Sequence, residues 1–192
     1  DVTAPDGVTC EQLASIPAGD GALAELNAAL LRDGLRLRID STPDKPIGLR
    51  VIDGGEVAAV SQGFVEIESA AGTTAEIIEF HTSVGDADQY ANTVLKLDIG
   101  DNAAIAHIRI QDRSLDHLQT ARTSVGVGRD ARFESASFDL GGGMVRNDLD
   151  IDIAHPGAEV SFDGLYLAGD GQHIDNHTRV DHRVGPATSR QE

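Results

Sequence analysis

The sequence predicts an all-β fold, a β-helix or β-solenoid of stacked coils with a short N-terminal capping helix. The first observation behind this prediction is a short pattern that begins at Gly72 and returns at Gly100 and Gly128, 28 residues apart each time. The second is the alternation of apolar and polar residues in stretches such as 94–99, which indicates strands rather than helices. A fixed period of this size is typical of solenoids, in which each repeat packs on its neighbours. An antiparallel sandwich with evenly spaced hairpins is the alternative.

The repeat has a consistent internal layout. Each copy ends on an alanine, and an apolar residue follows two places later. A fourth copy, 155–158, keeps the alanine and shifts the glycine. Glycine, asparagine or aspartate at the corners supplies the positive φ that sharp turns need. The alanines are Ala75, Ala103, Ala131 and Ala158, and the apolar residues are Ile77, Ile105, Phe133 and Val160.

Composition narrows the class of protein. The chain has 192 residues, a net charge of −17 and only 4% aromatic residues, so we expect a core of Val, Ile, Leu and Ala. The acidic balance argues against nucleic-acid binding, which needs clustered Lys and Arg. No apolar run is long enough for a transmembrane helix. Cys10 is the single cysteine, so no internal disulfide can form, and we expect a cytoplasmic protein.

Two regions follow from the pattern along the chain. Residues 1–34 are expected to be an irregular leader with one helix, whose stripe of Leu23, Leu26 and Leu30 would cover the first coil as a cap. From 35 the period changes to two, and 35–192 are expected to form the β-helix core. The chain stops after Glu192 with no evident cap, so we expect a core truncated at its C-terminal end. An uncovered end exposes unpaired strand backbone and therefore favours self-association.

Several segments resemble the SufB/SufD family of iron–sulfur cluster assembly proteins, SufD more than SufB. The most specific segment is 141–149, GGGMVRNDL, followed by 164–167, GLYL, and 172–178, QHIDNHT. Residues 26–34, 77–79 and 105–111 also match in order.

The resemblance implies a cytoplasmic scaffold subunit with a β-helix core and no catalytic residue. In the family, SufB and SufD pair with each other and each binds the ATPase SufC through a C-terminal helical domain. It also implies that iron–sulfur cluster and ATP belong to the whole complex, and that this stretch carries no cofactor. The cysteine and histidine linked to cluster handling lie beyond the matching region, so no residue here inherits that role.

The densest group of possible metal ligands lies near the C-terminus. His173, Asp175 and His177 alternate and would share one strand face, with His182 nearby. Such a set could hold zinc or iron together with a residue from the next coil. The alternative, which we favour, is a ladder of polar side chains on the solvent face.

The remaining family motif residues are expected to be structural. Arg146 and Asp148 fit an Arg-x-Asp motif, for which we expect an arginine–carboxylate pair that links adjacent coils. Gly164, Gln172 and Asp175 belong to the same set of motif positions. Residues 141–143 lack the Lys-Ser/Thr and helix of a phosphate loop and are expected to form a tight corner.

A different class of function stays open at this point. Asp148, Asp150 and Asp152 alternate on one strand, and carboxylates in such rows serve β-helical lyases and glycosidases. The sequence thus allows a carbohydrate-active enzyme as the alternative to an assembly scaffold. A plain structural solenoid without a partner is a third possibility.

Overall fold

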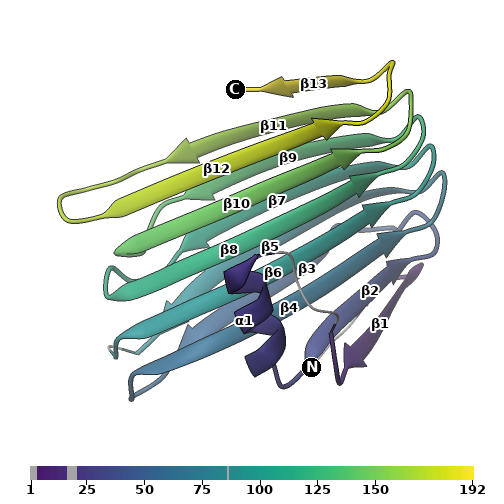
Figure 1. The fold of residues 1–192 in the computed structure, drawn as a ribbon. Coiled ribbons are helices and arrows are strands. Elements are labelled where there is room, and N and C mark those ends of the chain that lie inside the picture. The colour runs from purple at the N-terminus through teal and green to yellow at the C-terminus, as the bar shows by residue number, and fades with distance from the viewer. Residues whose placement is uncertain (1–3, 17–20, 86) are drawn as a thin grey trace.

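The chain winds into a β-solenoid of about five turns, which Figure 1 shows from the side with sheet A in front. The computed structural model describes residues 4–16, 21–85 and 87–192. Each turn gives one strand to each of two sheets. Sheet A has the order β1-β2-β4-β6-β8-β10-β12, and sheet B has the order β13-β11-β9-β7-β5-β3. Apart from β1, neighbouring strands run parallel, so the solenoid prediction is confirmed and the antiparallel sandwich is wrong.

The elements follow one another in chain order. They are β1 (Val8–Leu13), α1 (Ala22–Leu30), β2 (Gly34–Ile39), β3 (Ile47–Gly54), β4 (Ala59–Ser69), β5 (Thr74–Val84), β6 (Gln89–Ile99), β7 (Ala104–Asp112), β8 (His117–Val127), β9 (Arg132–Asp139), β10 (Met144–Ile153), β11 (Glu159–Tyr166), β12 (His173–His182) and β13 (Thr188–Gln191). Among the described residues, none of the helices has the length and apolar character needed to span a membrane.

One corner of each coil contains a residue in the left-handed backbone conformation. Gly72, Asn102, Asp130 and Gly157 have φ of 73°, 58°, 53° and 81°. Glycine, asparagine and aspartate therefore supply the positive φ at these corners, as predicted. The positions are 30, 28 and 27 residues apart.

The strand register corrects the first repeat. Thr74 pairs with Ala104, and Ala104 pairs with Arg132, so the equivalent of Gly72 is Asn102 and not Gly100. The sequence match between the first two copies is therefore wrong by two residues. Backbone pairing determines which residues of neighbouring coils are equivalent. A coil can be two residues longer and still have a similar sequence at its corner.

Gly100 and Gly128 are needed for a different reason. A Cβ atom at Gly100 would lie 2.6 Å from the carbonyl oxygen of Ser69, and one at Gly128 would lie 2.7 Å from that of Ile99. Each coil therefore rests directly on the backbone of the coil before it at this corner. Side chains near the same corner form the apolar core, with Ile105 and Phe133 fully buried.

Helix α1 lies on the outer face of sheet A across β4 and β6, and not over the end of the first coil (Figure 1). The Asn27 amide donates to the carbonyl oxygens of Gly63 at 2.9 Å and Asn92 at 2.8 Å. The Asn92 amide in turn donates to the carbonyl oxygen of Leu23 at 2.8 Å. Two buried amides, rather than an apolar stripe, fix the helix in place.

The leucine stripe of α1 does not pack as expected. Leu23, Leu26 and Leu30 are 37%, 40% and 55% exposed, whereas Ala24 and Asn27 face the sheet. The leader also contains a strand, because β1 pairs antiparallel with β2 and extends sheet A at this end. Asp20 is a candidate N-cap for this helix from the sequence alone, because an aspartate side chain can accept from the first helical N–H groups, but it lies outside the described residues.

We predict that Gly128→Ala destabilises the solenoid by about 1–3 kcal/mol, because the new methyl group must push two coils apart. Chemical denaturation of both forms measures the free energy of unfolding. Gly48→Ala is the matched control, since a Cβ there meets no atom within 4 Å. Equal stability of the two variants would contradict the close contact between coils.

Candidate functional site: a buried ionic cluster

The interior of the solenoid is apolar near one corner and polar farther along the strands. Ile77 on β5 and Ile105 on β7 point inward, and every second residue after them does the same. The side chains that follow are charged or hydrogen-bonding groups that are buried almost completely. They are Glu79, His81, His107, Arg109 and Gln111, joined by Asp53, Arg113, His117, Gln119, Asp139 and Asn147.

Glu79 lies between two histidines. Its Oε1 is 2.7 Å from Nε2 of His81, and its Oε2 is 3.0 Å from Nε2 of His107. Arg113 approaches the other ring nitrogen of His81 at 3.2 Å, so that nitrogen accepts and Nε2 donates to the carboxylate. The carboxylate thus receives a hydrogen bond from a side chain of its own coil and one from the next coil.

The environment lowers the pKa of both Glu79 and His81. Burial opposes ionisation of Glu79, but the attraction of His81 and hydrogen bonds from both histidines outweigh it and hold the pKa of Glu79 well below its usual range. Burial lowers the pKa of His81, and the positive charge of Arg113 adds to this against the pull of Glu79. Burial and Arg113 likewise lower the pKa of His117.

Arg113 follows β7 and connects distant parts of the coil. Its guanidinium donates to Asp53, with Nε 3.2 Å from Oδ2, and also to Gln119 on β8. Since Asp53 belongs to sheet B and Gln119 to sheet A, this arginine bridges the two sheets through the interior. The desolvation of its charge lowers the pKa of Arg113, and Asp53 counteracts that effect.

Arg109, on β7 itself, forms a second bridge between the two sheets. It donates to Asp139 on β9 at 3.0 Å and to Asn147 on β10 at 2.8 Å. Asn147 then donates to Asp139 at 2.9 Å and to Asn176 on β12 at 2.7 Å. Buried charges are tolerated only when paired and hydrogen-bonded, and these side chains supply one another with partners.

A cavity of about 210 Å³ adjoins the cluster. His107, Arg109 and Asn147 line it together with the hydroxyls of Ser135 and Ser137. The Nδ1 atom of His107 has no hydrogen-bond partner within the described part of the chain. The cavity is polar enough to hold water.

Most of the family motif residues lie on sheet A or in the turn before β12, whereas Gly164 lies on sheet B. Arg146 on β10 donates to Asp148 at 3.0 Å and to Asp175 on β12 at 3.1 Å, so it links two coils. Gln172 donates to the carbonyl oxygen of Gly142 at 2.9 Å. The backbone of Gly164 on β11 donates to the carbonyl oxygen of Glu192 at 3.2 Å.

The glycines at 141–143 form a corner. Gly142 has a φ of 82°, and its N–H donates to the carbonyl oxygen of Arg113 at 2.9 Å. A Cβ at Gly141 or Gly143 would overlap the backbone of the preceding coil. The geometry is that of the tight corner predicted from the sequence.

The proposed metal ligands are not gathered into one site. His173, Asp175 and His177 share the outer face of sheet A, where Asp175 pairs with His177 at 2.8 Å and with Arg146. His182 is an odd number of residues from the other histidines, faces the other side of β12 and contacts Ser189 at 3.0 Å. Throughout the described ranges, no three histidine, cysteine or carboxylate side chains are arranged to hold a metal ion.

Each aspartate in the row on β10 forms an ion pair with arginine. Asp148 pairs with Arg146, and Asp150 pairs with Arg122 at 2.6 Å and Arg179 at 2.8 Å. Asp152 pairs with Arg183 at 2.8 Å. The arrangement favours ion pairs between coils over a pair of free catalytic acids.

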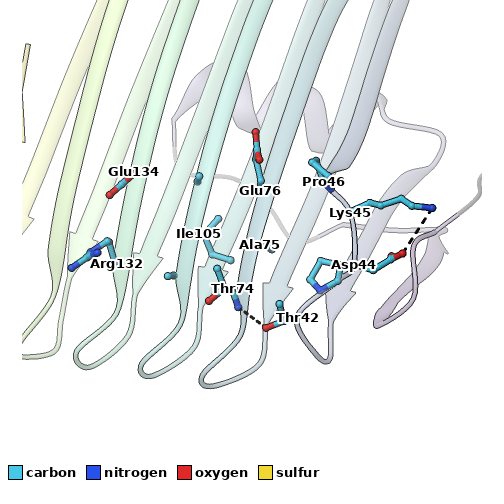
Figure 2. A pocket seen from close by; sticks show the side chains of 13 residues that line it. Thr42, Asp44, Lys45, Pro46, Thr74, Ala75, Glu76, Ile105, Arg132 and Glu134 are labelled. Carbon is cyan, nitrogen blue, oxygen red and sulfur yellow. Dashed lines mark hydrogen bonds and ion pairs between the residues drawn. The ribbon is translucent and has the colours of Figure 1, made fainter.

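A groove of about 500 Å³ lies on the outer face of sheet B. One wall is the loop 42–46, and the floor consists of β5, β7 and β9 near their first residues (Figure 2). Glu76 and Glu134 project beside it, and Arg132 lies next to Glu134. The groove was not predicted from the sequence, because its wall and its floor are separated by 28 or more residues along the chain.

Together, the fold and the buried cluster define a rigid parallel β-solenoid whose coils are joined by internal ion pairs. The cluster contains no thiol, since Cys10 is the only cysteine and lies on β1 beside Leu37. Residues 51–192 match the family model described as "SUF system FeS cluster assembly, SufBD core domain". The chain therefore belongs to the SufBD family.

Curated relatives agree with this family. The SufBD family protein Mb1497 of Mycobacterium bovis is 27% identical over 161 residues, which cover 84% of this chain and 38% of that protein. The iron–sulfur cluster assembly protein SufD of Escherichia coli is 26% identical over 153 residues, covering 78% and 36%. The SufBD family protein slr0076 of Synechocystis is 23% identical over 204 residues, covering 92% and 45%. The chain thus spans less than half the length of these relatives.

We predict that the free energy of unfolding falls by about 1 kcal/mol or more between pH 7.5 and pH 5.5. The unfolded chain takes up protons near the ordinary histidine pKa of 6.5, whereas His81 and His117 in the fold have lowered pKa values and resist them. The unfolded state binds more protons in this window, so acid favours it. Glu79 adds a loss at still lower pH, below its ordinary pKa of 4.5.

Denaturation at several pH values measures this slope. In His81→Gln the slope between pH 7.5 and 5.5 should be smaller, because one histidine with a lowered pKa has been removed. The two hydrogen-bond partners of His81, Glu79 and Arg113, each keep another partner. The exposed His155→Gln is the control and should keep the full slope. A slope unaffected by His81→Gln would show that this histidine does not couple folding to protons.

Proposed function

We propose that the chain is the β-helical core of a SufD-like scaffold subunit in a SufBCD-type iron–sulfur cluster assembly complex. The observation that carries this proposal is the family match over 51–192, which coincides with most of the solenoid. In the full-length protein, the subunit pairs with a SufB homologue and with a SufC ATPase in the cytoplasm. The cluster is cargo of the complex, ATP is bound by SufC, and this stretch holds no cofactor of its own.

The structure supports a scaffold role more than a catalytic one. The interior charges are engaged with one another, and the aspartates of β10 pair with arginines. Such contacts hold coils in a fixed register and present rigid outer faces to other proteins. A carbohydrate-active enzyme would need carboxylates free to exchange protons.

We predict that the full-length protein, co-expressed with the SufB and SufC homologues of its own genome, purifies with both as one complex. Affinity purification through a tag on this subunit, followed by size measurement, tests the prediction. SufC carrying a disrupted subunit-binding surface is the control and should be lost from the complex. Purification of the tagged subunit alone would contradict the proposal. Release of sugar products from polysaccharides by the isolated chain would then favour the enzyme alternative.

A further inference from the structure

The outer faces of the two sheets differ in chemistry. On sheet A, outward side chains form ion pairs from coil to coil, as where Glu66 accepts from Arg36 at 2.7 Å and Lys96 at 3.0 Å. On sheet B, the middle of the outer face is apolar. We call this surface the apolar face; its residues are Ile78, Phe80, Ile108, Ile110, Ala136, Phe138 and Leu165.

The apolar face is continuous because the strands are in register. Phe80, Ile110, Phe138 and Leu165 lie side by side on four neighbouring strands. Most of these side chains are half-buried by one another, and Leu165 at the end of the row is 52% exposed. A contiguous apolar surface that crosses several strands is a candidate site for binding another protein.

A row of carboxylates borders the apolar face along one side. Glu76, Ala106 and Glu134 are neighbours on three strands, two residues before Ile78, Ile108 and Ala136. That spacing places the two rows about 7 Å apart. We call Glu76 and Glu134 the acidic row. Both are exposed, and within the part of the chain that the structure describes neither has an ion-pair partner.

The groove of Figure 2 begins at this acidic row. The small Ala106 separates Glu76 from Glu134, and Ala104 continues the floor toward the corner. Carboxylates two strands apart are roughly 10 Å from each other at the backbone. A long cationic side chain can lie over the alanine and reach either carboxylate.

We propose that this face binds an amphipathic helix of a partner protein, with its apolar stripe on the apolar face and Lys or Arg residues of one flank on the acidic row. The face spans four strands, roughly 14 Å, which about three helical turns would cover. The stripe would therefore have apolar residues at i, i+3 or i+4, and i+7. This inference does not depend on the assignment to iron–sulfur assembly.

Two other occupants fit less well. A partner strand needs free backbone groups, but β5, β7 and β9 are already paired on both sides, so only side chains can pack on this face. A second copy of the chain would bring another acidic row and another net charge of −17. A helix with a basic flank satisfies both the apolar face and the unpaired carboxylates.

The test places a photo-cross-linking amino acid at Ile110 in the full-length protein, with cross-linking in the cells of its source organism. Mass spectrometry identifies the attached peptide. We expect a peptide of another protein with the stated apolar spacing and a basic flank. Attachment to a second copy, to the same chain, to a peptide without this pattern, or to nothing overturns the proposal.

Binding of the identified peptide, made synthetically, then tests both halves of the site. Phe80→Thr/Ile110→Thr should weaken binding at least tenfold, and Glu76→Gln/Glu134→Gln should weaken it several-fold and reduce its dependence on salt. Controls that keep full affinity are Leu118→Thr on the outer face of sheet A and Glu25→Gln/Glu56→Gln at exposed positions elsewhere. Unfolding curves check that each variant is folded. Loss of affinity in the control variants, or full affinity in both test variants, would refute the proposal that this surface binds the peptide.

Discussion

The stacking of coils in a fixed register is the constraint on which the rest of this structure depends. Each inward side chain lies beside its equivalent in the next coil, so a buried charge must find its partner there or across the narrow interior. At the buried cluster the register brings such partners together, because Glu79 lies beside Arg109 and Ile77 lies beside His107. A coil two residues shorter, as the sequence repeat predicts, would place Ile77 beside Ile105. In the observed register these two isoleucines are not neighbours, and the buried charges have partners instead. A buried charge without a partner would cost several kcal/mol of folding free energy.

The consequence is a solenoid held together in two different ways. Near one corner, apolar residues such as Ile105 and Phe133 are removed from water, and the backbones approach closely at Gly100 and Gly128. Farther along the strands, Arg109 and Arg113 connect sheet A to sheet B through directed hydrogen bonds. Apolar contacts tolerate small shifts, whereas directed bonds between charged groups do not. The polar half therefore fixes the relative position of coils that the apolar half only brings together.

Sequence alone predicts the strands of the solenoid apart from β1, the residue types of its corners and the family, because each depends on residues close together in the chain. It does not predict which face of a strand is inside. Alternation in Ile108-Arg109-Ile110 indicates a strand, and the usual preference would bury the isoleucines. The structure buries Arg109 instead, because Ile105 sets the phase of β7 and a partner for Arg109 exists on β9, 30 residues away. Sequence likewise does not predict which face of α1 packs on the sheet. Its leucines form an apolar stripe, but the contact is made by Asn27 with Asn92, 65 residues away.

The distribution of charge explains why one outer face differs from the other. Acidic residues outnumber basic ones by 32 to 15, so many carboxylates have no basic side chain within the chain to pair with. The arginines that form pairs lie mainly in the interior and on sheet A, where they link coils. On sheet B, Arg132 beside Glu134 pairs with Glu159, so within the described residues Glu76 and Glu134 have no ion pair. They lie next to apolar side chains that no element of the described chain covers. Surfaces that complete the fold have their charges paired internally, whereas unpaired carboxylates beside half-buried phenylalanines and an exposed leucine are suited to contact with another molecule. The solenoid thus separates its tasks by face: the interior and sheet A maintain the register, and sheet B is available for recognition.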